Sequence, residues 1–209
     1  MVSGAPSHHL VLASASPGRL ALLRAAGLAP EVVASGVAEE AVTGPTPAAT
    51  ARARAERKAR AVAPRRTTGG AQRTVVVGCD SLLSIDGEAR GKPASAAEAR
   101  AWWQAQRGRS GVLVTGHAVV EVASGRCVTG VAETVVRFGS PTEAEIEAYI
   151  ATGEPLAVAG ACTIDGYGAP FVDGIDGDPG NVVGLSLPLL RQLLAELGVA
   201  ITDLWDLSR

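Results

Sequence analysis

Residues 11–27 read VLASASPGRLALLRAAG, and the rest of the chain is organised around them. The apolar start is typical of a buried strand, and the spacing of Leu20 and Leu23 predicts a helix behind it. Pro17 suits the first turn of that helix because it has no N–H group to leave unpaired there. The stretch therefore predicts a strand, a turn and a helix in immediate succession.

Small hydroxyl residues occupy the junction between this strand and this helix. Ser14 and Ser16 carry hydroxyl groups, Arg19 carries a cation, and the free N–H groups of a helix start bear partial positive charge. Such a junction is suited to holding an anion. The simpler interpretation is an ordinary serine cap, and the stretch taken alone favours it.

Length and composition limit the classes of protein to consider. A chain of 209 residues can bury a full core, and we expect a single domain over residues 1–209. A hydrophobic content of 47% favours a folded chain, while an aromatic content of 3% leaves Val, Leu, Ile and Ala to build the core. The net charge of −2 provides no field that would attract nucleic acid or anionic lipid.

Targeting signals and cysteines indicate the cytoplasm. No predominantly apolar run without charged residues approaches the roughly 20 residues needed to cross a bilayer, and the apolar run over residues 10–13 is too short for a signal peptide. Cys79, Cys127 and Cys162 are odd in number and widely spaced, which fits buried thiols in a reducing compartment better than disulfides or a zinc site. We therefore expect a cytoplasmic protein with neither a membrane nor a nucleic-acid partner.

Acidic residues follow two of the predicted strands. Residues 74–81 form a continuous apolar strand that ends in Asp80 and Ser81, where an Asp serves either metal or base chemistry or the capping of a turn. Glu39 lies with a second acid in a loop after a strand predicted over residues 30–35. Carboxylates there hold a hard divalent cation or belong to a solvated turn.

Two lysines are candidates for binding phosphate. Residues 46–62 predict a helix with five basic side chains, most of which should be solvated, and any one of them, such as Lys58, could turn inward. A hairpin over residues 82–90 leads to Lys92, which a glycine and a proline hold between them. That placement suits a phosphate ligand and equally a plain surface turn.

The remaining elements are predicted from capping signals and hydrophobic patterns. They comprise helices over 95–107, 140–151 and 188–197, long strands over 111–122 and 126–138, a bulge over residues 115–117, a polar connector over 64–72, extended structure over 156–164, and a short strand or turn over 182–185. Trp102 and Trp103 are adjacent and cannot face the same way, so one of them should pack in the core.

Together these pieces resemble the signature of the Maf family of nucleoside triphosphate pyrophosphatases. The similar segments follow the family's order, and they are residues 14–27, 35–39, 58–59, 78–81, 91–93, 115–116, 159–161 and 175–185. The resemblance runs from about Leu10 to about Leu197, which is nearly the whole chain.

The resemblance implies an α/β fold of the Maf and inosine-triphosphatase type. Such a molecule is elongated and two-lobed, has a mixed central sheet with a cleft between the lobes, and is often a homodimer. The implied reaction is hydrolysis of a nucleoside triphosphate to the monophosphate and pyrophosphate with Mg²⁺ or Mn²⁺. We expect a pyrimidine substrate such as dTTP or UTP, or a modified nucleotide. The family's link to septum formation is a phenotype and adds no chemistry.

The resemblance also assigns a role to each candidate residue. The residues that would hold the triphosphate are Ser14, Ser16, Arg19, Lys58 and Lys92, the two lysines being catalytic as well. Asp80 would anchor the metal or orient the attacking water, and Glu39 would complete the metal site, either carboxylate being a candidate for the base. Ser81 and Asp165 would contact the substrate.

Two residues depart from the family's pattern. Gly18 stands where the family usually has the first of two consecutive arginines, which removes a phosphate ligand that a neighbour such as Arg24 would have to replace. Asp165 stands where the family usually has Gln or Glu, which bears on the choice of base. The loss at Gly18 motivates the alternative function, a nucleotide-binding regulator of cell division that has lost turnover.

Overall fold

A mixed β-sheet runs through the molecule, as the resemblance predicts. The computed structural model describes residues 8–65 and 73–207, so most of the connector expected over 64–72 lies outside the described residues. Within the described part, seven strands pair in the order β2-β1-β3-β5-β6-β7, and β4 pairs with β3 off this path. The strands are β1 (His8–Leu12), β2 (Glu31–Val32), β3 (Arg73–Ile85), β4 (Glu88–Arg90), β5 (Ser110–Glu121), β6 (Cys127–Phe138) and β7 (Val172–Asp176).

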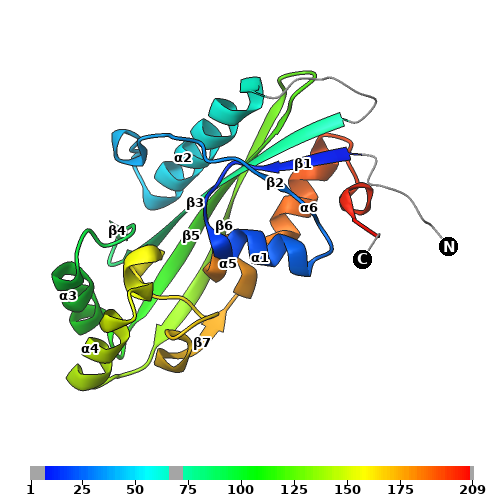
Figure 1. Ribbon diagram of the computed structural model, residues 1–209. Helices are drawn as coiled ribbons and strands as arrows, with labels where there is room; N and C mark the ends of the chain where they lie inside the picture. Colours follow the sequence, from blue (N-terminus) through cyan, green and yellow to red (C-terminus); the bar gives the residue numbers. More distant parts are fainter. Residues whose placement is uncertain (1–7, 66–72, 208–209) are drawn as a thin grey trace.

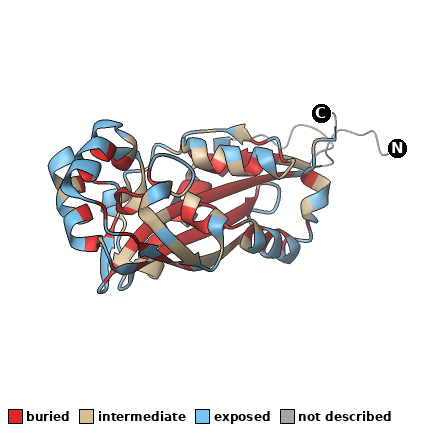
Figure 2. Cartoon of the chain, turned by 90° about the horizontal axis from the view of Figure 1, so that it is seen from below, coloured by how far each residue is buried: buried red, intermediate tan, exposed pale blue. Residues whose placement is uncertain are grey.

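Strand β1 is parallel to both of its neighbours, and the other pairs are antiparallel. The helices are α1 (Pro17–Ala25), α2 (Pro47–Val62), α3 (Ala96–Gln106), α4 (Glu143–Ala151), α5 (Pro179–Val183) and α6 (Leu187–Glu196). Figure 1 shows α3 and α4 at one end of the long strands β3 and β5, with β1 and α6 toward the other end. The molecule is correspondingly elongated, with buried strands at its centre (Figure 2).

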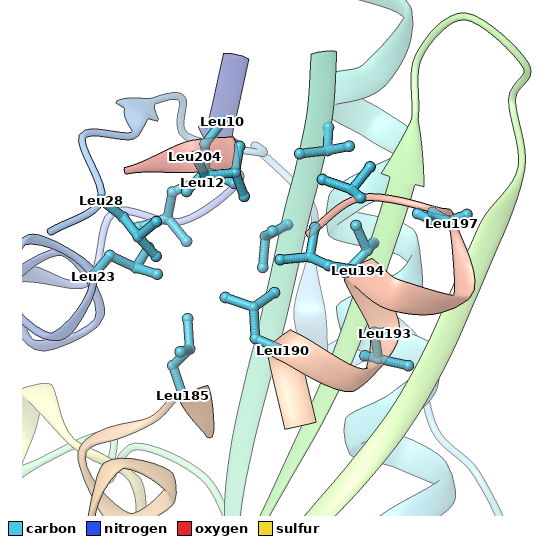
Figure 3. Packing of buried hydrophobic residues seen from close by; sticks show 14 of the residues in the cluster. Leu10, Leu12, Leu23, Leu28, Leu185, Leu190, Leu193, Leu194, Leu197 and Leu204 are labelled. Atoms are coloured by element: carbon cyan, nitrogen blue, oxygen red, sulfur yellow. The ribbon is translucent and has the colours of Figure 1, made fainter. Parts of the chain in front are cut away.

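Leucines form the core where α1 and α6 meet the sheet. Leu12, Leu23, Leu190 and Leu194 have no exposed surface, and Figure 3 shows them gathered from β1, α1 and α6. Such a cluster follows from the apolar spacing of the two helices. Aliphatic packing of this kind confirms the expectation from the low aromatic content.

Aromatic residues form a separate core at the end that carries α3 and α4. Trp103 is fully buried and makes edge-to-face contacts with Phe138 and Tyr149, at ring-centroid distances of 5.8 and 5.7 Å. Its neighbour Trp102 instead lies under the guanidinium of Arg90, 5.7 Å from the ring centroid. The prediction that one of the two tryptophans packs in the core is therefore confirmed.

Helix α2 lies directly against the backbone of the sheet. A Cβ atom on Gly78 would lie 2.3 Å from the carbonyl oxygen of Ala55, and one on Gly116 would lie 2.3 Å from the carbonyl carbon of Ala51. Only glycine permits this approach. The predicted bulge at Gly116 is wrong, because β3 and β5 pair in continuous register through Asp80 and Gly116. The glycine serves the packing of α2 instead.

Two further predictions of local structure are wrong. Residues 156–164 do not form a strand but include two 3₁₀ turns, Glu154–Ala157 and Ala159–Ala161, with Gly160 at a φ of 64°. Residues 182 and 183 belong to the short helix α5, which Asp178 caps by accepting a hydrogen bond from the Gly180 amide, and the turn is confined to Gly184. The Asp-Pro pair at residues 178–179 is a helix-start signal that identifies this helix.

The three cysteines are free as expected, although Cys127 is only partly buried. Cys79, Cys127 and Cys162 are free thiols, and the first and last are buried. Within residues 8–65 and 73–207, helices that are both long and apolar enough to span a bilayer are absent.

Candidate active site

One cavity of ≈ 560 Å³ collects nearly all of the predicted site residues. It is lined by the junction of β1 and α1, the loop after β2, helix α2, strand β3, the turn after β4, and segments near residues 157–163 and 182–184. The predicted residues in its wall are Ser14, Ser16, Arg19, Glu39, Lys58, Asp80, Ser81 and Lys92. Segments far apart in the sequence therefore converge on one site.

The serines of the β1–α1 junction serve the backbone as well as the cavity. Ser16 is the N-cap of α1 and accepts a hydrogen bond from the amide of Arg19 at 3.4 Å. Ser14 accepts one from the amide of Ser16 at 3.2 Å. The ordinary cap interpretation is thus correct, and both hydroxyls nonetheless line the cavity.

Arg19 is fixed in place by three acceptors from three parts of the chain. Its Nε donates to the carbonyl of Gly184 at 2.8 Å, its Nη1 to Ser14 Oγ at 3.1 Å, and its Nη2 to Ser81 Oγ at 3.0 Å. Each terminal nitrogen of a guanidinium carries two hydrogens, so one on each remains for a ligand. The side chain is buried at the start of α1, which makes it a rigid cationic wall.

Behind Ser81 lies a buried hydroxyl that the sequence did not single out as a site residue. Thr115 Oγ1 is 2.9 Å from Ser81 Oγ and donates to the carbonyl of Asn181 at 3.2 Å. Thr115 has no exposed surface. It therefore connects the wall formed by Arg19 and Ser81 to helix α5.

Lys58 lies between the two predicted carboxylates. Its Nζ is 2.6 Å from Asp80 Oδ1 and 2.8 Å from Glu39 Oε1, and it also donates to the carbonyl of Cys79 at 3.3 Å. Lys58 and Asp80 are 5% and 4% exposed, so water screens this pair little. Since α2 presses against the sheet at Gly116, which is opposite Asp80, its packing sets this contact.

The pKa values of the two carboxyl groups are displaced in opposite directions. Burial raises the pKa of Asp80 above its ordinary value, although the charge of Lys58 acts against the change. Partial burial also acts to raise the pKa of Glu39, but the hydrogen bond and charge of Lys58 outweigh it and leave that pKa lowered. Opposite displacements are typical of sites where one carboxylate stays ionised and the other handles a proton.

The donor set fits a divalent cation that is shared with a phosphate ligand. Asp80 Oδ2 is buried and has no hydrogen-bond partner in the described part of the chain. Clusters of three or more His, Cys, Asp or Glu side chains fit to hold a metal are absent from the described residues. Mg²⁺ usually needs only one or two protein carboxylates, because water and substrate phosphates complete its shell. Glu39 and Asp80 are therefore sufficient.

Asp165 is the predicted residue that does not line the cavity. Its side chain is exposed, and it accepts a hydrogen bond from the hydroxyl of Thr163, which does line the cavity. A Cβ atom on Gly18 would lie 3.6 Å from Asp165 Oδ2 and 3.0 Å from Val183 Cγ1. Asp165 thus lies beside the first turn of α1, at the edge of the site.

The cavity wall contains Arg54 of helix α2. It does not contain Arg24, which the sequence suggested as the replacement for the arginine absent at Gly18. Arg24 is exposed and lies outside the cavity wall, whereas Arg54 lines it. Arg54 Nη1 is 3.7 Å from Asp80 Oδ2. Its position four residues before Lys58 puts both on one face of the helix, and this spacing was the signal available in the sequence.

The chain is similar to known proteins over nearly its whole length. The family model described as Maf-like protein matches residues 9–197. The nucleoside triphosphate pyrophosphatase of Streptomyces coelicolor is 64% identical over 96% of this chain and 96% of its own. The nucleoside triphosphate pyrophosphatase of Streptomyces avermitilis is 59% identical over the same shares, and that of Salinispora tropica is 53% identical over 98% of this chain and 91% of its own.

A solved structure gives a more distant similarity. The dITP/XTP pyrophosphatase of Mycobacterium abscessus covers 96% of this chain and 100% of its own, with 17% identity and a TM-score of 0.39. A similarity of that size supports no inference about this chain.

Proposed function

The chain belongs to the Maf family and is a nucleoside triphosphate pyrophosphatase, and from that premise we propose that it cleaves pyrimidine or modified nucleoside triphosphates with a divalent metal ion. The observation that carries the proposal is the cavity in which Lys58 joins Asp80 and Glu39 within one wall that also contains Arg19 and Lys92. Cleavage of a phosphoanhydride requires charge neutralisation and a positioned water, and these groups supply both.

The reaction balances with water as the other reactant. The water oxygen bonds to the α-phosphorus, the bond from that phosphorus to the oxygen bridging the β-phosphorus breaks, and the electron pair leaves with pyrophosphate. Asp80 orients the water and accepts its proton, a role supported by the raised pKa of this carboxyl. Arg19 and Lys92 hold the phosphate oxygens, and Lys58, whose donors are occupied by Asp80, Glu39 and the Cys79 carbonyl, adds positive charge beside them.

Glu39 and Asp80 would hold Mg²⁺ or Mn²⁺ together with the phosphates. When bound, the ion neutralises charge that develops on the phosphate oxygens. Glu39 suits a ligand role because its lowered pKa keeps it ionised. Titration of Mn²⁺ into protein and nucleotide, followed by electron paramagnetic resonance, should show weaker binding for Glu39→Gln than for the wild type.

Asp165 bears on which base is accepted. An ionised carboxylate only accepts hydrogen bonds, so among the pyrimidines it favours uracil and thymine, which present N3–H, over cytosine, whose N3 is an acceptor. Its exposed side chain lies beside the first turn of α1, where a base at the edge of the cavity could reach it. Asp165→Asn, which also donates, should narrow the difference in kcat/KM between UTP and CTP.

The test is release of pyrophosphate from a panel of standard and modified triphosphates. The wild type should act on at least one pyrimidine or modified nucleotide, and Asp80→Asn should lower kcat by about 10²–10⁴-fold. Asp86→Asn is the matched control, because this exposed carboxylate lies in the turn between β3 and β4, at a φ of 52° that Asn tolerates. Full activity of Asp80→Asn would refute the role, and nucleotide binding without any pyrophosphate release would indicate the regulator instead.

A further inference from the structure

The cations of the cavity differ in how many donors they have left for a ligand. The three N–H donors of Lys58 are occupied by Asp80, Glu39 and the carbonyl of Cys79. Arg19 has five N–H donors, and three of them are occupied by protein oxygens. A triphosphate is polyanionic, so its tight binding calls for donors that the protein itself does not already occupy.

Of the two arginines in the cavity wall, Arg54 has the less engaged terminal nitrogens. Its Nε donates to the carbonyl of Val42 at 2.9 Å, which aims the guanidinium along the cavity wall. Within the described residues, neither Nη1 nor Nη2 has a hydrogen bond, and the nearest carboxylate oxygen, Asp80 Oδ2, is 3.7 Å from Nη1. Four N–H donors therefore remain next to the carboxylate that handles the water.

We propose that Arg54 is a substrate-binding residue whose two terminal nitrogens bind the phosphate chain of the nucleotide beside Asp80. The inference rests on the proposed function and adds a residue to it. A guanidinium matches two phosphate oxygens with two parallel N–H groups, which a lysine does not. With its Nε held by a backbone carbonyl, Arg54 loses little side-chain entropy when phosphate binds.

The hydrogen bond from Arg54 to Val42 gives a second way in which loss of Arg54 would weaken phosphate binding, namely by displacing the loop. The experiment must separate this indirect effect from the loss of a direct phosphate contact. Val42 follows the turn that carries Glu39, and the Val42 amide donates to the carbonyl of Glu39 at 3.0 Å. Removing Arg54 could therefore displace Glu39. Thr50 provides a second, independent anchor of the same loop, because its Oγ1 accepts from the amide of Gly44 at 2.8 Å. Thr50 is not part of the cavity wall.

The experiment measures binding of inorganic pyrophosphate by calorimetry, with Mg²⁺ present, so that it does not depend on turnover. Arg54→Gln should weaken binding by about 10- to 100-fold and raise KM for UTP, and Arg54→Lys should restore part of the affinity. Arg57→Gln, an exposed residue of the same helix, and Thr50→Val should bind pyrophosphate as the wild type does. Circular dichroism verifies that each variant is folded.

Three outcomes would overturn the inference. Unchanged pyrophosphate affinity of Arg54→Gln excludes a phosphate contact. An equal loss in Thr50→Val assigns the effect to the anchored loop, and a fall in kcat with unchanged KM and affinity makes Arg54 a positioning residue for Asp80. Failure of the wild type to release pyrophosphate from any nucleotide would refute the proposed function, while the affinities would still decide the role of Arg54.

Discussion

The ammonium group of Lys58 lies 2.6 Å from Asp80 Oδ1, and both side chains are almost completely buried. The contact joins helix α2 to strand β3 in the wall of the cavity. Two opposite charges that are withdrawn from water depend on each other, because either one alone would be a buried charge without compensation. The pair therefore has a structural as well as a chemical role.

Lys58→Met should lower the free energy of unfolding at pH 7 by about 3–5 kcal/mol, since it leaves the Asp80 carboxylate buried beside Glu39. Urea denaturation measures this. Arg60→Met is the matched control on the same helix: it breaks an exposed pair with Glu56 and should cost less than about 1 kcal/mol.

A double-mutant cycle tests whether Lys58 and Asp80 are coupled as the distance indicates. Lys58→Met combined with Asp80→Asn should be more stable than the sum of the single effects predicts, by at least about 1 kcal/mol, because no buried charge of the pair remains. Simple additivity would show that the contact contributes little to stability.

Arg19→Lys should reduce both stability and activity although it keeps the positive charge. A lysine ammonium cannot reach Gly184, Ser14 and Ser81 from one point, so two of the three hydrogen bonds are lost. We expect a loss of about 2 kcal/mol in unfolding free energy and a rise in KM for the nucleotide. Arg24→Lys, on the exposed side of the same helix, should change neither quantity.

The cavity was more predictable from sequence than the packing that forms it. Asp80 was marked by its place at the end of an apolar strand, and the family resemblance selected Lys58 among the basic residues of its helix, which spacing alone did not. The distance between α2 and β3 depends instead on Gly78 and Gly116, which are far from α2 in the sequence and have no chemistry of their own. In a sequence, a strand glycine that permits close packing of a helix cannot be distinguished from a glycine in a β-bulge. The helix that packs on it must be known first.

Gly116→Ala should therefore disrupt the active site without touching a site residue. The added Cβ would lie 2.3 Å from the backbone of Ala51, and backbone atoms cannot rotate away as a side chain does. We expect a loss of about 1–3 kcal/mol in stability and a fall in kcat, because a shifted α2 withdraws Lys58 from Asp80.

Gly125→Ala controls for the loss of a glycine. Nothing lies within 4 Å of its added Cβ, so only its φ of 69° opposes the change, at a cost of about 1–2 kcal/mol, and kcat should be unchanged. If Gly116→Ala kept full kcat, the close approach of α2 would not be what positions Lys58.

Local signals also explain why the helix after β7 was mistaken for a strand or turn. Residues 182–185 are apolar and short, and a run of that length does not distinguish a strand from a helix. The deciding information lay upstream, in the cap at Asp178. Arg54 was missed for a related reason, since charges around a basic helix look alike until one face is known to meet the cavity.

His117 should make the protein less stable in mild acid. Its Nε2 accepts from the amide of Ser186 at 2.8 Å, and so Nδ1 carries the proton and donates to the carbonyl of Thr115 at 3.0 Å. Burial, with a smaller contribution from the charge of Arg19, lowers the pKa of His117 from 6.5 to about 4, against the opposing effects of the Thr115 carbonyl and Asp178. Between these two values the unfolded chain binds a proton that the folded chain excludes, so stability is full above pH 6.5 and falls until pH 4, by about 3 kcal/mol.

Urea denaturation of the wild type and of His117→Gln from pH 4 to pH 8 measures this loss. The variant should be less stable at pH 7, because Gln does not reproduce both hydrogen bonds of the imidazole. The difference between the two proteins should then shrink as the pH falls, since only the wild type has an imidazole to protonate. A difference that stays constant over this range, or an NMR titration of His117 with a midpoint near 6.5, would show that the imidazole is open to protons in the folded state.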